Sequence, residues 1–77
     1  MPTVHLRFYA SLREHFERPA LMQVFELGAS VGQVVDDVVP HRLRNGLRCA
    51  VNEDFVEMNR VLQDGDIVDL LPPFGGG

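Results

Sequence analysis

Hydrophobic and polar residues alternate in the first part of the chain. Val4, Leu6 and Phe8 are separated by the more polar His5 and Arg7, and the alternation continues to residue 9. A period of two is typical of a strand that buries one face. The pattern predicts a first strand over residues 3–9.

A short helix is predicted next, from residue 11 to about residue 17. Ser11 and Glu14 have the spacing of a capping box, in which each side chain bonds a free backbone N–H of the other. Leu12 and Phe16 are four residues apart and would face inward together. Pro19 is expected to end this helix.

The main helix is predicted from a stripe of valines that follows a second capping box, Ser30 with Gln33. The valines that recur at helical spacing are Val31, Val34, Val35, Val38 and Val39. Valine is a mediocre helix former because its χ1 angle is restricted, so this helix should depend on packing against a sheet. Pro40 is expected to stop it.

The other apolar segments predict further strands. Residues 20–27, before the break at Gly28, predict a second strand paired with the first. Later strands are predicted over residues 47–51, 55–62 and 67–71, the middle one short, irregular and at the sheet edge. Strand pairs on either side of one long helix indicate an α+β fold, with a twisted mixed sheet of about four to five strands covered on one face.

Composition limits the function classes. The chain has 77 residues, of which 45% are hydrophobic and 23% charged, as expected for one small globular domain over residues 1–71. Such a domain has little volume for an enclosed active site, which argues against a self-sufficient enzyme. Cys49 is the only cysteine, so neither an intrachain disulfide nor a cysteine zinc cluster is expected.

The charge argues against some partners. A net charge of -4 is unfavourable for nucleic-acid binding, and all seven basic residues are arginine, so lysine chemistry is excluded. The N-terminal segment lacks the pattern of a signal peptide, and no apolar stretch approaches the length of a membrane span. We therefore expect a cytoplasmic protein without nucleic-acid or membrane partners.

The last six residues, 72–77, form the candidate chemical site. Pro72 and Pro73 favour an extended conformation, so this tail could project the end of the chain up to roughly 20 Å from the domain. Glycine at the tip has no Cβ to collide with the walls of a narrow channel, and it leaves its carbonyl open to attack from both faces. An extended, flexible tail that enters a partner is the resulting prediction.

Four motifs in the chain resemble those of a known family. They are Phe-Tyr-Ala-Ser-Leu-Arg-Glu at 8–14, Cys-Ala-Val-Asn-Glu-Asp-Phe-Val at 49–56, Leu-Gln-Asp-Gly-Asp-Ile-Val at 62–68 and Pro-Pro-Phe-Gly-Gly-Gly at 72–77. In this order they resemble the small sulfur-carrier subunit of molybdopterin synthase, a ubiquitin-like β-grasp family. Two differences stand out: residues 40–48 are short for the family, and arginines such as Arg13 or Arg60 must replace its lysines.

The resemblance implies a function in sulfur transfer. A ubiquitin-activating-type enzyme would use ATP to adenylate the Gly77 carboxylate, and a persulfide donor would convert the adenylate into a thiocarboxylate. Its sulfur would attack the pterin precursor of the molybdenum cofactor in the large synthase subunit. The domain would bind no cofactor and would not catalyse by itself. The residues implied in partner binding are Gly76, Gly75, Phe74, Pro73, Pro72 and Arg13.

Two alternatives remain open at this point. A sulfur carrier for thiazole, tRNA thiolation or an amino acid would use the same tail chemistry. A ubiquitin-like interaction module or protein modifier would have an inert terminus or one joined to other proteins.

The remaining polar residues favour structural explanations. Cys49 is expected to be a buried small hydrophobe. Asp64 and Asp66 should form a turn around Gly65, because aspartate side chains bond the turn backbone. Asp36 and Asp37 should form the solvated face of the main helix. The three histidines, His5, His15 and His41, are expected on the surface.

Overall fold

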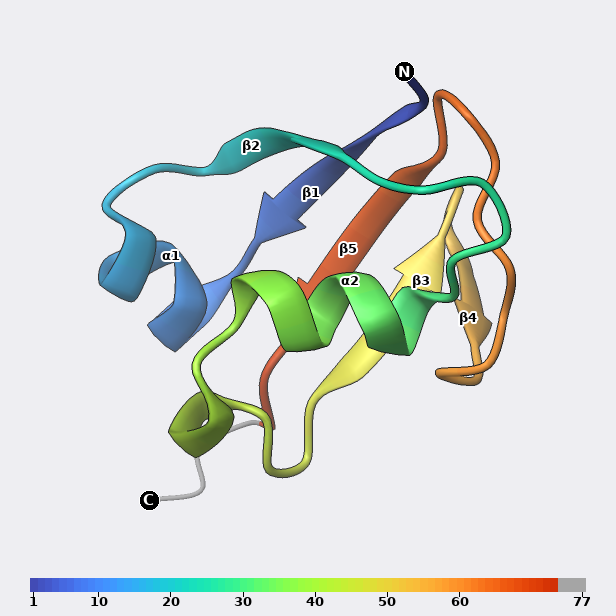
Figure 1. The fold of residues 1–77 in the computed structure, drawn as a ribbon. Helices are drawn as coiled ribbons and strands as arrows, with labels where there is room; N and C mark the ends of the chain where they lie inside the picture. Colours follow the sequence, from blue (N-terminus) through green and yellow to red (C-terminus); the bar gives the residue numbers. More distant parts are fainter. Residues whose placement is uncertain (74–77) are drawn as a thin grey trace.

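The computed structural model describes residues 1–73, which contain five strands and three helices (Figure 1). In chain order these are β1 (Thr3–Phe8), α1 (Ala10–Phe16), β2 (Ala20–Val24), α2 (Val31–Val38), the 3-10 helix η1 (His41–Leu43), β3 (Arg48–Val51), β4 (Asp54–Val56) and β5 (Ile67–Leu71). The strands form one sheet in the order β2-β1-β5-β3-β4. The predicted α+β architecture, a β-grasp sheet with one main helix and an early short helix, is confirmed.

The last strand occupies the middle of the sheet. β5 runs parallel to β1, with His5 opposite Ile67, and antiparallel to β3, with Cys49 opposite Leu70. β1 and β2 are antiparallel neighbours, as predicted. α2 crosses one face of this mixed sheet (Figure 1), and the opposite face carries no helix in the described part of the chain. The chain therefore leaves the domain from its central strand.

The core lies between the sheet and α2. The predicted inward residues of the first strand, Val4, Leu6 and Phe8, are buried. They pack with the valine stripe, whose buried members are Val31, Val34, Val35 and Val39. Val38, at the end of the stripe, is partly buried against the same cluster. The stripe that predicted the helix is thus the surface that holds it to the sheet.

The capping box at the start of α2 is confirmed. The backbone N–H of Gln33 donates to Ser30 Oγ at 3.3 Å, and the N–H of Ser30 donates to Gln33 Oε1 at 2.8 Å. The next two free donors of the helix are satisfied from elsewhere, since Val31 N–H donates to Arg60 O and Gly32 N–H donates to Met58 O. A distant loop therefore completes this helix terminus.

That loop corrects the prediction of a strand over residues 55–62. β4 ends at Val56, and the chain then leaves the sheet to run beside the start of α2, with a single bridge between Ser30 and Val61. The carbonyls of this segment bond the helix donors, so they are not used in a β ladder. Likewise β2 ends at Val24, three residues before the predicted end of the second strand.

The first helix was also predicted with the wrong cap. α1 begins at Ala10, so Ser11 lies inside the helix, and the N-cap residue Tyr9 makes no side-chain cap bond. Its end is at Glu17, whose φ of 56° turns the chain before Pro19 is reached. The predicted inward pair is confirmed, because Leu12 is buried and the Phe16 ring stacks on the Phe8 ring with 4.2 Å between their centroids.

No helix in residues 1–73 combines the length and the apolar character that crossing a membrane requires.

Candidate functional site

The base of the C-terminal tail sits on a glycine turn. After β5 ends at Leu71, Pro72 is half-buried and Pro73 lies against Gly46, in the turn before β3. A Cβ added at Gly46 would lie 3.1 Å from Pro73 Cγ, and the φ of Gly46 is +76°. Both the backbone and the close approach therefore favour glycine there. Asn-Gly dipeptides favour turns, so the pair Asn45 and Gly46 indicates a turn here, but no local pattern indicates its contact with Pro73.

The remaining tail residues, Phe74, Gly75, Gly76 and Gly77, lie outside the described residues. The roles assigned to them from the sequence therefore remain predictions, and so does the boundary between domain and tail.

The predicted contact residue Arg13 lies on the exposed side of α1. It lines a shallow groove together with Glu14, Glu17 and Arg18. Pro73 lies instead against Gly46. The described structure thus puts Arg13 within reach of solvent, and its role in partner binding stays a prediction.

The helix-free face of the sheet carries an ion pair beside the tail. The guanidinium of Arg7, on β1, donates from Nε and from Nη2 to the two carboxylate oxygens of Asp69, on β5, the latter bond measuring 2.9 Å. The two residues are directly opposite in the parallel register. The hydrogen bonds from Arg7 and the charge of Asp69 raise the pKa of Arg7. The pair ties the central strand to its neighbour two residues before the strand ends.

Apolar side chains are also exposed on this face of the sheet. Phe55 is 61% exposed and Met22 60% exposed, and Ile67 is also partly accessible. The guanidinium of Arg48 lies over the Phe55 ring at 4.2 Å from its centroid. Aromatic, methionine and arginine side chains are enriched in protein interfaces, so this face has the composition of a contact surface next to the tail.

A polar network organises the turn before β5. Asp66, which is buried, accepts hydrogen bonds from the backbone N–H of Gln63 at 2.8 Å and from the Asn52 amide at 3.0 Å. Arg60 lies 3.5 Å from the same carboxylate. Asp64 accepts from the backbone N–H of Thr3 at 2.9 Å. The predicted turn role of Asp66 is confirmed, since its side chain bonds the backbone of Gln63 in the same turn. Asp64 lies in the turn, but its side chain bonds Thr3 in β1 instead. Asn52 and Arg60 are partners of Asp66 that the local pattern could not identify.

The other candidate side chains offer no reactive group. Cys49 is buried, and this burial raises the pKa of its thiol to about 11, so the thiol stays protonated at neutral pH. The prediction of a buried small hydrophobe is confirmed. Asp36 and Asp37 are exposed on α2, as predicted, with Asp36 accepting a bond from Arg44 at 2.9 Å. Among residues 1–73, no three His, Cys, Asp or Glu side chains group as a metal site would require.

Solved structures confirm the fold class. SAMP1 from Haloferax volcanii superposes with a TM-score of 0.85 at 19% identity, over 97% of this chain and 99% of that one. A putative molybdopterin converting factor subunit 1 from Pyrococcus furiosus gives 0.81 at 21% identity, over 95% and 99%. A chain from the complex of subunits 1 and 2 of the molybdopterin-converting factor from Helicobacter pylori superposes with a TM-score of 0.66 at 20% identity. The match covers 97% of this chain and 99% of that one.

The sequence comparison is more specific than the fold. No curated protein matches the chain significantly. The profile of the ThiS family matches residues 6–77, which includes all four quoted motifs and the glycine-rich tail. The chain therefore belongs to the ThiS family of ubiquitin-like sulfur carriers.

Proposed function

We propose that this protein is the small, sulfur-carrying subunit of a molybdopterin synthase. One observation carries the proposal: the central strand β5 leads directly into a diproline seated on Gly46, while the family match continues to Gly77. A carboxylate at Gly77 would be held away from the domain by a tail whose base is anchored. In the proposal this tail enters the active site of a large subunit.

The proposed reaction begins on an adenylating enzyme of the ubiquitin-activating type. The Gly77 carboxylate attacks the α-phosphorus of ATP, and pyrophosphate leaves. A persulfide sulfur displaces AMP from the acyl-adenylate, and a thiol then reduces the new sulfur–sulfur bond, which leaves a thiocarboxylate on Gly77. In the large subunit this sulfur attacks the pterin precursor, and water cleaves the acyl–sulfur bond to restore the carboxylate.

The partners supply the catalytic groups in this scheme. Cys49 is the only thiol of the chain, and its burial and raised pKa make it a poor sulfur relay. Gly76 and Gly75 allow close approach in a narrow channel, and Phe74 would anchor the tail in a groove of the partner. Arg13 would provide a cationic contact, and the helix-free face around Arg7 and Phe55 would contact the partner beside the tail.

The names of the structural neighbours agree with the proposal but also define its main alternative. Two neighbours are described as subunits of a molybdopterin converting factor, one of them in a complex of subunits 1 and 2. SAMP1 is named a small archaeal modifier protein. If this chain were a modifier, an amine of another protein would attack the activated Gly77 and form an amide. A sulfur carrier of another pathway would share the first steps and differ in the acceptor.

Intact-mass spectrometry tests the proposal. The chain is incubated with a cognate adenylating enzyme, ATP and a sulfide source, beside a variant that ends at Gly75. Replacement of one terminal oxygen by sulfur in the full-length chain alone would support a sulfur carrier. Transfer of that sulfur to the pterin precursor in the presence of the large subunit would support the synthase. Charging without transfer to the pterin would point to another acceptor, and amide adducts on other proteins would point to a modifier.

A further inference from the structure

β2 is an edge strand with one free side. Its neighbour in residues 1–73 is β1 alone, since the sheet order begins at β2. The N–H of Phe25 donates to Pro2 O, and the N–H of Phe8 donates to Pro19 O, so alternate residues of this strand point their backbone groups toward β1. The residues whose N–H and C=O point to the free side are Ala20, Met22 and Val24. Such an edge can pair with another strand.

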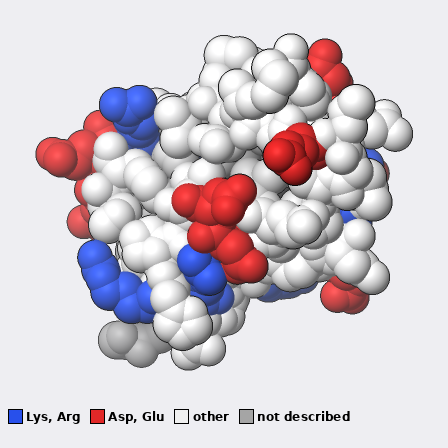
Figure 2. Space-filling model, viewed as in Figure 1, with Lys and Arg blue, Asp and Glu red and all other residues white. Residues whose placement is uncertain are grey.

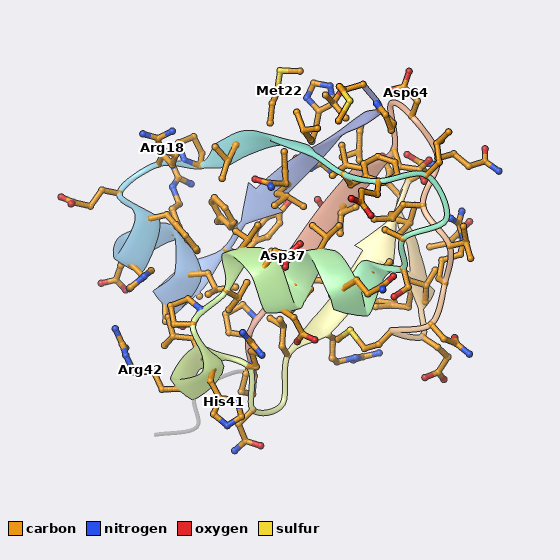
Figure 3. The ribbon with its side chains drawn as sticks, viewed as in Figure 1. Arg18, Met22, Asp37, His41, Arg42 and Asp64 are labelled. Carbon is orange, nitrogen blue, oxygen red and sulfur yellow. The ribbon has the colours of Figure 1, made fainter. Side chains whose placement is uncertain are left out.

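A groove lies between this edge and α2. It measures about 340 Å³; its apolar lining includes Val24, Phe25 and Val34, and Glu26 and Asp37 add two carboxylates. Figure 3 shows Asp37 on α2 at the centre of the view, below β2, and Met22 projecting outward from β2. The groove therefore offers apolar surface and negative charge beside the free backbone groups of Val24.

The two sides of α2 differ in how they are filled. On the side of β4, residues 57–62 run along the start of the helix, and Met58 O accepts from Gly32 N–H at 2.8 Å. On the side of β2 the groove is lined by Met1 and by the strand end and the loop that follows it, and it is open to solvent. In Figure 1 the orange segment that contains residues 57–62 runs beside β4.

The surface around β2 is apolar, with acidic charge toward the helix. Leu27 is 82% exposed, and Met1, Met22 and Val24 are also exposed. In Figure 2 the upper part of the molecule, where β2 lies, is largely uncharged, and acidic side chains lie below it, over α2. Since Glu26 and Asp37 line the groove and no arginine does, a ligand with lysine or arginine is complementary. A second copy would instead bring its own carboxylates against these.

We propose that the free edge of β2 and the groove beside α2 bind an extended apolar peptide segment of another protein, with a lysine or arginine placed at Glu26 and Asp37. Main-chain hydrogen bonds to Met22 and Val24 would add the peptide as a further strand, and alternate side chains would enter the groove. Pro73, at the base of the tail, lies against Gly46 and does not line the groove, so we expect peptide binding to leave chemistry at Gly77 unaffected.

One side chain occupies part of the site in the free protein. Gln23 Nε2 donates to the carbonyl oxygen of Val24 at 3.2 Å, which satisfies one acceptor of the free edge. An added strand must displace this amide. Gln23→Ala should therefore bind peptides more tightly than the wild type, a result that a merely structural role of Gln23 would not produce.

The test uses a random nine-residue peptide library displayed on phage, selected on the full chain and on the Val24→Pro variant. Proline removes the outward N–H of Val24 without breaking a bond to β1, and edge strands tolerate it. We expect peptides with alternating apolar residues and a basic residue to be enriched on the wild type only. When the best peptide is synthesised, titration should shift the amide resonances of Met22 and Val24 and slow their hydrogen exchange.

Charge reversal provides an independent check should Val24→Pro disturb the fold. Glu26→Lys with Asp37→Lys should weaken peptide binding by about tenfold, whereas the control Glu14→Lys on α1 should not change it. The proposal is overturned if no basic apolar peptide is enriched, if enriched peptides bind Val24→Pro equally well, or if resonance shifts map to the helix-free face. Concentration-dependent dimerisation through β2 would identify a second copy as the occupant and would also overturn it.

Discussion

Arg7 and Asp69 lie opposite each other on the parallel strands β1 and β5, although 62 positions separate them in the sequence. Both carboxylate oxygens of Asp69 accept bonds from the guanidinium, and the Asp69 side chain is only 12% exposed, whereas the Arg7 side chain is 40% exposed. The pair therefore shields a carboxylate at the centre of the sheet. It also lies close to the point where the tail leaves the domain.

The first prediction concerns this pair. Arg7→Met should lower the melting temperature by several degrees, because it leaves the Asp69 carboxylate largely buried without its partner. The double variant Arg7→Met with Asp69→Leu should recover part of that loss, since no charge is then left unpaired. Thermal unfolding followed by circular dichroism measures both. If the melting temperature of the double variant fell by the sum of the losses of the two single variants, the coupling between Arg7 and Asp69 would be contradicted.

The second prediction concerns the seat of the tail. Gly46→Ala should destabilise the domain by about 1 kcal/mol or more, because alanine disfavours a φ of +76° and its Cβ would press on Pro73. Gly65→Ala is the matched control: its φ is +88°, but nothing lies within 4 Å of the added Cβ. Urea denaturation compares the stabilities. Only Gly46→Ala should also slow thiocarboxylate formation, by displacing the tail, and equal rates for both variants would contradict a role of the Pro73 contact.

The third prediction concerns pH. Burial raises the pKa of Cys49 from 9.0 to about 11, so between these values the folded protein binds a proton that the unfolded chain has lost. The free energy of unfolding should accordingly be unaffected by this group below pH 9 and should fall as pH rises from 9 to 11. Cys49→Val lacks the titrating group, so its free energy of unfolding should fall less over the same pH interval. Urea denaturation of both proteins at several pH values provides the comparison, and parallel curves would show that Cys49 does not contribute.

The fourth prediction concerns the start of α2. Ser30→Ala removes the acceptor for the Gln33 N–H and should reduce the free energy of unfolding by about 1 kcal/mol. The valine-rich helix has little intrinsic propensity to offset this loss. Ser11→Ala is the control, because Ser11 lies inside α1 and is not its cap, and should have a small effect. The same urea titration measures both, and equal losses would contradict the assignment of the caps.

Local pattern was sufficient wherever near neighbours decide the structure. Alternation identified the first strand, the valine stripe and the Ser30–Gln33 box identified the main helix, and the last strand had the predicted bounds of residues 67–71. The diproline and glycine motif identified the tail as the candidate site, and the family match includes it. These signals depend on side chains a few residues apart, which the sequence displays directly.

Tertiary structure decided the features that join distant parts of the chain. The central place of β5, the Arg7–Asp69 pair and the contact of Pro73 with Gly46 all unite segments whose separation carries no local signal. The pattern of residues 57–62 predicts a strand, but carbonyls of this segment accept hydrogen bonds from the free N–H groups at the start of α2. The sequence by itself thus determined most of the elements and marked the tail as the candidate reactive site. Packing alone decided their order in the sheet and the open edge of β2, because strand pairing depends on the closure of long loops around a shared core.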